Sequence, residues 1–170
     1  MAAPTSSFNV TQSTIGVDLN NSSTTQLFAL GTKVLGSNNS EWVYVQAATS
    51  VTAYKVVAFN GTFTCGMASG GDLIGGIAEI AVAQTSAAAS EYFWVCRRGD
   101  RVGVMCTGSV SVANQLYMAA SSTPTGILSI SASASGTIYG ISLVTVVDTA
   151  NATVHSAIVS WPRGVPSTLL

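Results

Sequence analysis

The stretch Glu91-Tyr-Phe-Trp-Val-Cys-Arg97 is rich in aromatic and β-branched residues and predicts a β-strand. Successive side chains of a strand point to opposite faces, so one face would carry Tyr92, Trp94 and Cys96 and the other Phe93, Val95 and Arg97. Both faces then hold large apolar groups. We therefore expect this strand to lie in the middle of the protein body, or beneath a neighbouring subunit. A tight turn is expected directly after it, at Arg98-Gly99-Asp100.

Outward from this strand, eight further segments show the same enrichment in apolar and β-branched residues. They are 41–48, 53–60, 74–83, 101–107, 115–119, 126–130, 137–147 and 154–161. Turn-forming residues separate them, notably Ser37-Asn38-Asn39 and Asn60-Gly61, and Pro162 and Pro166 are expected to end the last strand. No apolar period of 3.6 residues persists for three turns. About nine short strands predict an all-β fold with a sandwich or barrel-like body.

A faint internal repeat divides this body. Ile74-Gly-Gly-Ile-Ala78 resembles Ile138-Tyr-Gly-Ile-Ser142 at an offset of 64 residues, and Tyr54-Lys-Val-Val-Ala58 precedes Tyr117-Met-Ala-Ala-Ser121 by 63. We interpret the body, residues 27–165, as two related β units at about 50–114 and 115–165. A duplicated unit cannot bury its apolar face alone, so the two are expected to share one core. Residues 166–170 are a short tail.

Residues 1–26 are rich in Ser, Thr and Asn, and their apolar residues are too sparse for a core. This composition predicts an extended N-terminal arm that orders only against another surface. The first residues lack the basic and apolar regions of a signal peptide. No run of apolar residues approaches the 18 that would indicate a transmembrane helix.

The composition is poor in charge and rich in small residues. Of 170 residues, 6 are Lys or Arg and 7 are Asp or Glu, which gives a net charge of −1, while 100 are Ser, Thr, Ala, Val or Gly. A nucleic-acid-binding protein needs a concentrated basic surface, which this chain lacks. Isolated soluble proteins usually keep more charge on their surface. The composition therefore favours a protein packed against partners and argues against most enzymes.

No residues predict catalysis. The chain has a single histidine, His155, and no Gly-x-Ser-x-Gly motif to present a nucleophilic serine. We expect His155 to occupy an outward polar position on a strand. The carboxylates are scattered, and Glu79, which interrupts an apolar strand, is expected to point outward or to pair with an arginine. The carboxylates are Asp18, Glu41, Asp72, Glu79, Glu91, Asp100 and Asp148.

The cysteines and arginines also predict no cofactor or metal site. Cys65, Cys96 and Cys106 lack metal-ligand spacing, and an odd number favours free buried thiols, with a Cys96–Cys106 disulfide as the alternative. Arg97, Arg98 and Arg101 form the one basic cluster, which could make carboxylate or cation–π contacts between subunits or be a solvated turn. We therefore assign no catalytic, cofactor-binding or metal-binding residues.

The segment from Ala29 to Ala48, above all Leu30 to Val45, resembles the opening of capsid cement, or head decoration, proteins of tailed bacteriophages. The segments 74–78, 91–97, 115–118 and 138–142 add to this resemblance, which covers roughly residues 27–163. It implies a β-rich, non-enzymatic protein, often trimeric, that sits on the outer surface of the virion where major capsid subunits meet. The implied partners are the major capsid protein and further copies of the chain, with no nucleic acid and no membrane.

Two other functions stay open at this level. The first is a receptor- or glycan-binding β module of a viral fibre or adhesin, in which exposed aromatic rings would stack on sugars. Trp42, Tyr44, Trp94 and Trp161 are the rings suited to that role. The second is a hydrolase, for which the sequence shows no catalytic constellation.

Overall fold

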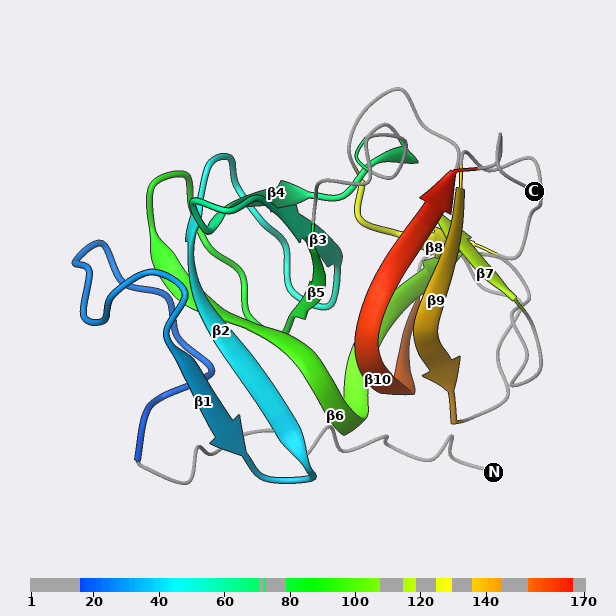
Figure 1. The fold of residues 1–170 in the computed structure, drawn as a ribbon, viewed down its shortest axis with the longest axis horizontal. Helices are drawn as coiled ribbons and strands as arrows, with labels where there is room; N and C mark the ends of the chain where they lie inside the picture. The colour runs from blue at the N-terminus through cyan, green and yellow to red at the C-terminus, as the bar shows by residue number, and fades with distance from the viewer. Residues whose placement is uncertain are drawn as a thin grey trace.

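The computed structural model describes residues 16–70, 72, 79–107, 115–118, 125–129, 136–144 and 153–166. In these ranges the chain forms ten β-strands, which confirms the predicted all-β fold (Figure 1). They are β1 (Lys33–Gly36), β2 (Ser40–Ala47), β3 (Val56–Phe59), β4 (Thr64–Met67), β5 (Glu79–Ala83), β6 (Tyr92–Thr107), β7 (Leu116–Met118), β8 (Leu128–Ser129), β9 (Gly136–Leu143) and β10 (Thr153–Pro166). No helix of the described part has the length and apolarity needed to cross a bilayer.

The strands close into two rings that share β6. In the first ring, β2 pairs with β4, β4 with β3, β3 with β5, β5 with β6, and β6 with β2. In the second ring, β6 pairs with β8, β8 with β7, β7 with β9, β9 with β10, and β10 with β6. Figure 1 shows the two rings side by side, with β6 running from one to the other.

The strands of the two rings pair in the same pattern. Each has a single parallel pair, Ala47 beside Cys65 in the first ring and Thr107 beside Ser129 in the second, and every other pair is antiparallel. Cys65 and Ser129 are 64 residues apart, the offset of the sequence repeat. The paired strands of the first ring run from residue 40 to Arg98, and those of the second ring from Arg98 to residue 166. Each ring therefore begins with a strand that precedes the expected unit boundaries of 50 and 115.

The predicted turn at Arg98-Gly99-Asp100 is wrong, because β6 runs through it as one strand of 16 residues. Arg98 lies opposite Glu41 of β2 and also opposite Ser160 of β10, so the strand passes from one ladder to the other at this point. Gly99 is buried, and a Cβ there would lie 3.0 Å from Cβ of Ser40. Arg101 has φ of 59°. The strand therefore bends sharply without reversing, and glycine allows the close approach.

The expectation that Pro162 ends the last strand is also wrong, since β10 continues to Pro166. The register of β10 against β9 shifts between Val159 and Arg163, and Trp161 has φ of 42°. Pro162 therefore lies in a bulge, where a missing N–H costs no ladder hydrogen bond. Gly140 faces this bulge, with φ of 78°, and a Cβ on it would lie 2.4 Å from the carbonyl oxygen of Ser160.

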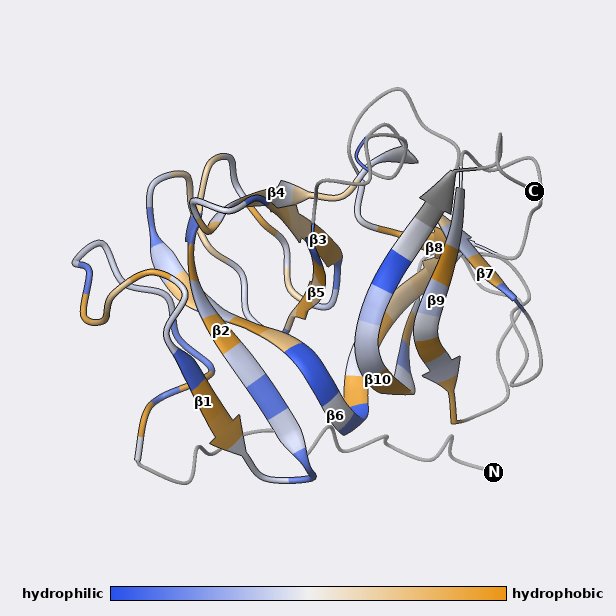
Figure 2. Cartoon of the chain, in the orientation of Figure 1, coloured by the Kyte–Doolittle hydropathy of each residue, from blue (hydrophilic) through white to orange (hydrophobic). Residues whose placement is uncertain are grey.

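The apolar core has two parts. One fills the interior of the first ring and consists of Val43, Val45, Ala47, Val51, Val57, Phe59, Cys65, Ala81, Ala83, Ala87, Phe93 and Val95. The other fills the second ring and continues onto the outer side of β2 and β6, where it includes Trp42, Tyr44, Trp94 and Cys96. Both faces of β6 are thus covered, as the sequence predicts for residues 92–97. Figure 2 shows the mainly apolar β3 and β5.

Candidate functional site

The segment 16–26 lies against the body of its own chain, although the sequence assigns it to an extended arm. Leu19 is fully buried in the core that contains Trp94. Ser23 and Tyr92 exchange two backbone hydrogen bonds, of 2.9 and 2.8 Å. The Ser22 hydroxyl donates to a Glu91 carboxylate oxygen at 2.7 Å. These contacts fix residues 16–26 on the outer side of β6; the remainder of the predicted arm, residues 1–15, lies outside the described residues.

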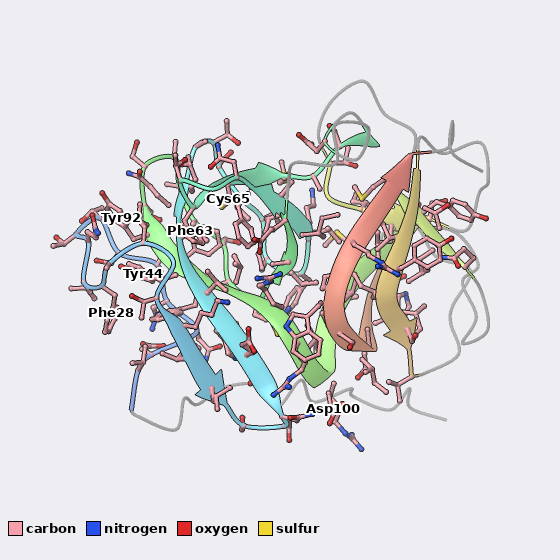
Figure 3. The ribbon with its side chains drawn as sticks, viewed as in Figure 1. Phe28, Tyr44, Phe63, Cys65, Tyr92 and Asp100 are labelled. Carbon is pink, nitrogen blue, oxygen red and sulfur yellow. The ribbon has the colours of Figure 1, made fainter. Side chains whose placement is uncertain are left out.

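An aromatic groove of about 500 Å³ opens between this segment and the first ring. Figure 3 shows Phe28, Tyr44 and Tyr92 gathered there. Leu27 at the rim is 65% exposed, and its N–H donates to the Tyr44 hydroxyl at 3.1 Å. The complete lining is Gly16, Val17, Asp18, Asn21, Ser22, Ser23, Leu27, Phe28, Tyr44, Tyr92 and Trp94. This combination of apolar walls with a few polar groups is typical of a binding site.

The rings at the base of the groove pack on one another. Phe28 meets Tyr44 edge to face with centroids 5.4 Å apart and lies 5.3 Å from Trp94. Tyr44 lies 4.9 Å from Trp94 and stacks on Tyr92 at 6.2 Å. Such offset and tilted contacts stabilise aromatic clusters. The base of the groove therefore consists of rings that support one another.

The charged groups beside the groove are acidic. Asp18, in its lining, accepts hydrogen bonds from the Asn21 side chain and from the Asn20 N–H at 2.9 Å, and these bonds lower the pKa of Asp18. Glu91 accepts from the Ala88 N–H at 2.8 Å as well as from Ser22, and its pKa is lowered in the same way. Both carboxylates are thus ionised at neutral pH.

A second notable surface is the outer face of β9 and β10, which we call the β9–β10 face. Six large apolar side chains of the described residues are exposed, and four of them lie on β9, on β10 or, in the case of Val144, directly after β9 with its N–H bonded to Ser156 of β10. They are Tyr139 at 37%, Val144 at 44%, Ile158 at 46% and Trp161 at 46%. Arg163 is exposed opposite Tyr139 in the ladder. A clustered apolar surface of this kind marks an interaction site more often than scattered exposed residues do.

Arg98 connects this face to the first ring. Its guanidinium carbon lies 4.9 Å from the centroid of the Trp161 ring, and its Nε donates to the Asn39 carbonyl at 3.1 Å. The sequence left open that Arg97, Arg98 and Arg101 make cation–π contacts between subunits. Arg98 makes such a contact within its own chain. The contact places the Trp161 ring beside Arg98, at the edge of the β9–β10 face.

The structure brings Glu79 and Arg97 together, as the sequence predicts for Glu79. Oε2 of Glu79 lies 2.5 Å from Nη1 of Arg97, and the Arg97 guanidinium sits 5.8 Å from the Phe59 centroid. The basic cluster is therefore divided: Arg97 contacts the first ring, Arg98 lies on Trp161, and Arg101 is exposed. Nothing gathers the three arginines into one basic site.

His155 is buried, so the expected outward position is wrong. It lies opposite Val104 of β6, on the side of β10 that carries the buried Ala157 and Val159. The three cysteines are buried and free, as predicted, and burial raises their pKa values to about 12. Among the described residues, no three His, Cys, Asp or Glu side chains gather in a way that could hold a metal ion.

The aromatic rings proposed for glycan stacking are mostly inaccessible. Trp42, Tyr44 and Trp94 are each at most 2% exposed, and Trp161 is the one exposed ring of the four. The groove itself was missed by sequence reasoning, because its residues come from segments 16–28, 44 and 92–94. The one local signal was the polar run Asp18-Leu-Asn-Asn-Ser22, which is typical of a side-chain-capped turn.

No family model matches the chain, and no curated protein matches it.

Proposed function

We propose that this chain is a non-enzymatic structural protein of a bacteriophage virion, which binds the outer surface of the head and joins neighbouring major capsid subunits as a homotrimer. The resemblance of residues 27–163 to head decoration proteins motivates the proposal. The observation that carries it is the exposure of large apolar side chains in separate places on one folded body. Leu27 and Leu35 are 65% and 56% exposed beside the first ring, and the β9–β10 face lies on the second ring.

Separate apolar surfaces suit such a protein, because it must contact further copies of itself as well as major capsid subunits. Contacts of standard size bury about 1,600 Å² in total and need no chemistry. The low charge of the chain agrees with this role, since most of the binding free energy would come from buried apolar area and close packing.

The test is to mix the purified protein with phage heads that lack it and to sediment the heads. We expect the protein to co-sediment at a fixed ratio to the major capsid protein and to raise the temperature at which the heads release DNA. Heads that bind none of the protein would overturn the proposal. A parallel run without heads shows how much of the protein sediments by itself.

A further inference from the structure

We propose that the chain associates head to tail with itself: the aromatic groove of one copy receives the β9–β10 face of the next. This inference rests on the homotrimer part of the proposed function and adds the two surfaces that form the contact. The groove lies on the first ring, among residues 16–28, Tyr44, Tyr92 and Trp94. The β9–β10 face lies on the second ring (Figures 1 and 3).

The two surfaces differ in shape in a complementary way. The groove is a hollow of about 500 Å³ with a base of packed aromatic rings. On the β9–β10 face, the bulge at Trp161 gives this residue φ of 42° and leaves its ring 46% exposed, held by Arg98. A large, pre-positioned ring that enters an apolar hollow is the usual anchor of a protein interface, because little side-chain entropy is lost on binding.

The two surfaces also differ in charge. Asp18 and Glu91 stand beside the groove, and hydrogen bonds keep both ionised. The β9–β10 face carries Arg163 and, against Trp161, Arg98. Glu41 lies opposite Arg98 in the ladder, and the exposed Asp100 and Arg101 follow Arg98 on β6, so three arginines and two carboxylates leave this region with one net positive charge. An acidic groove and a net basic face attract each other, whereas two grooves or two faces repel. The charges therefore favour a contact between unlike surfaces.

A contact between unlike surfaces leaves one groove and one face free in every dimer. Such a heterologous contact closes into a ring when its rotation fits a symmetric number of copies, and otherwise grows into a filament. A rotation of one third of a turn gives the proposed homotrimer.

The experiment uses the full chain and two variants that each remove one side of the contact. The groove variant is Leu27→Arg, at a position 65% exposed. The face variant combines Trp161→Ala with Ile158→Ser, at positions each 46% exposed. The control is Leu35→Arg, an exposed leucine on β1, separated from β10 by β2 and β6 in the sheet. Circular dichroism melts establish that each variant is folded, and light scattering after size exclusion gives the mass.

We expect the wild-type chain and Leu35→Arg to form the same oligomer, and each of the other variants to be a monomer of 17.3 kDa. An equimolar mixture of the groove and face variants should give a dimer that does not grow, because it contains one intact groove and one intact face. The dimer should weaken at least 10-fold in dissociation constant between 50 mM and 500 mM NaCl.

Three results would overturn the inference, and they can be told apart. A mixture of folded variants that stays monomeric refutes the head-to-tail contact. An oligomer that persists in either variant, or is lost equally in Leu35→Arg, places the interface elsewhere and leaves the homotrimer proposal standing. A wild-type chain that is monomeric at every concentration refutes self-association as a whole, while binding to phage heads is decided by the sedimentation assay.

Discussion

Replacing Trp94 with alanine should be among the most damaging single changes in the described part of the chain. Trp94 is 2% exposed, lies on the central strand β6, and packs against Phe28 at 5.3 Å and Tyr44 at 4.9 Å. Truncation of a buried tryptophan costs about 3–5 kcal/mol, from the lost apolar burial and the cavity that remains. The loss should approach the upper limit, because closed ladders on both sides keep β6 from moving into the cavity.

The matched control is Trp161→Ala, which removes the same side chain from an exposed site. Trp161 is 46% exposed, and its main contact is the Arg98 guanidinium, so its loss should cost about 1 kcal/mol or less. Guanidinium unfolding is followed by far-ultraviolet circular dichroism, because the substitution removes a fluorophore. Equal destabilisation by the two variants, within about 1 kcal/mol, would refute the argument that burial on the outer side of β6 supports the fold.

Three further predictions concern other parts of the fold. Gly140→Ala should destabilise the chain by more than ~2 kcal/mol, since its φ is 78° and a Cβ would collide with the Ser160 carbonyl; an unchanged melting temperature would contradict the bulge geometry. Because hydrogen bonds lower the pKa values of Asp18 and Glu91, their stabilisation is complete above the ordinary values of 3.8 and 4.5 and is lost as pH falls through the folded-state values, so segment 16–26 should release first on acidification; amide protection factors there, corrected for the intrinsic exchange rate, that do not fall before those of β6 during an acid titration would contradict this. The three cysteines, with pKa values near 12, should resist a thiol reagent at pH 8 and all react after unfolding; rapid labelling of the folded chain would count against their burial.

Local sequence pattern predicts the strands whose side chains are large and apolar. Residues 92–97 carry bulky groups on both faces, and only a central position buries both, so β6 could be predicted to be central. The strands β1 and β4 were not predicted. Their sequences, Lys-Val-Leu-Gly and Thr-Cys-Gly-Met, show no alternation of polar and apolar residues and contain few β-branched residues. Their pairing with β2 and β3 decides that they are strands.

The local sequence at Arg98-Gly99-Asp100 could not show that the strand continues instead of reversing, for a physical reason. A tight turn and a sharp bend both need a glycine and polar neighbours, so the local sequence is the same for both. The outcome depends on long-range pairing: Gly99 lies opposite Val159, and the strand gains a second ladder by continuing. The same holds for Pro162, whose bulge exists because β9 provides Gly140 opposite it.

The groove and the β9–β10 face could be predicted from the sequence even less well than the strands. The groove joins residues that are up to 78 positions apart, from Gly16 to Trp94, and it exists because Leu19 anchors segment 16–26 on the body. A truncation that tests the predicted arm alone must therefore stop at residue 15, since removing residues 1–26 would also take away a core side chain.

The structure gives a further reason for the many small apolar residues in the composition. A ring of five strands encloses less space than the eight-stranded barrels whose interiors side chains just fill. The interior of the first ring accordingly holds five Val, four Ala and one Cys beside two Phe. These Val and Ala residues are nine of the 42 Ala and Val of the chain, so part of that abundance follows from a narrow interior and carries no information about partners. Two observations still favour a protein that binds partners: charged residues are scarce, and some large apolar side chains stay exposed. The proposal that the chain assembles with partners therefore rests mainly on the groove and the β9–β10 face, and less on the composition.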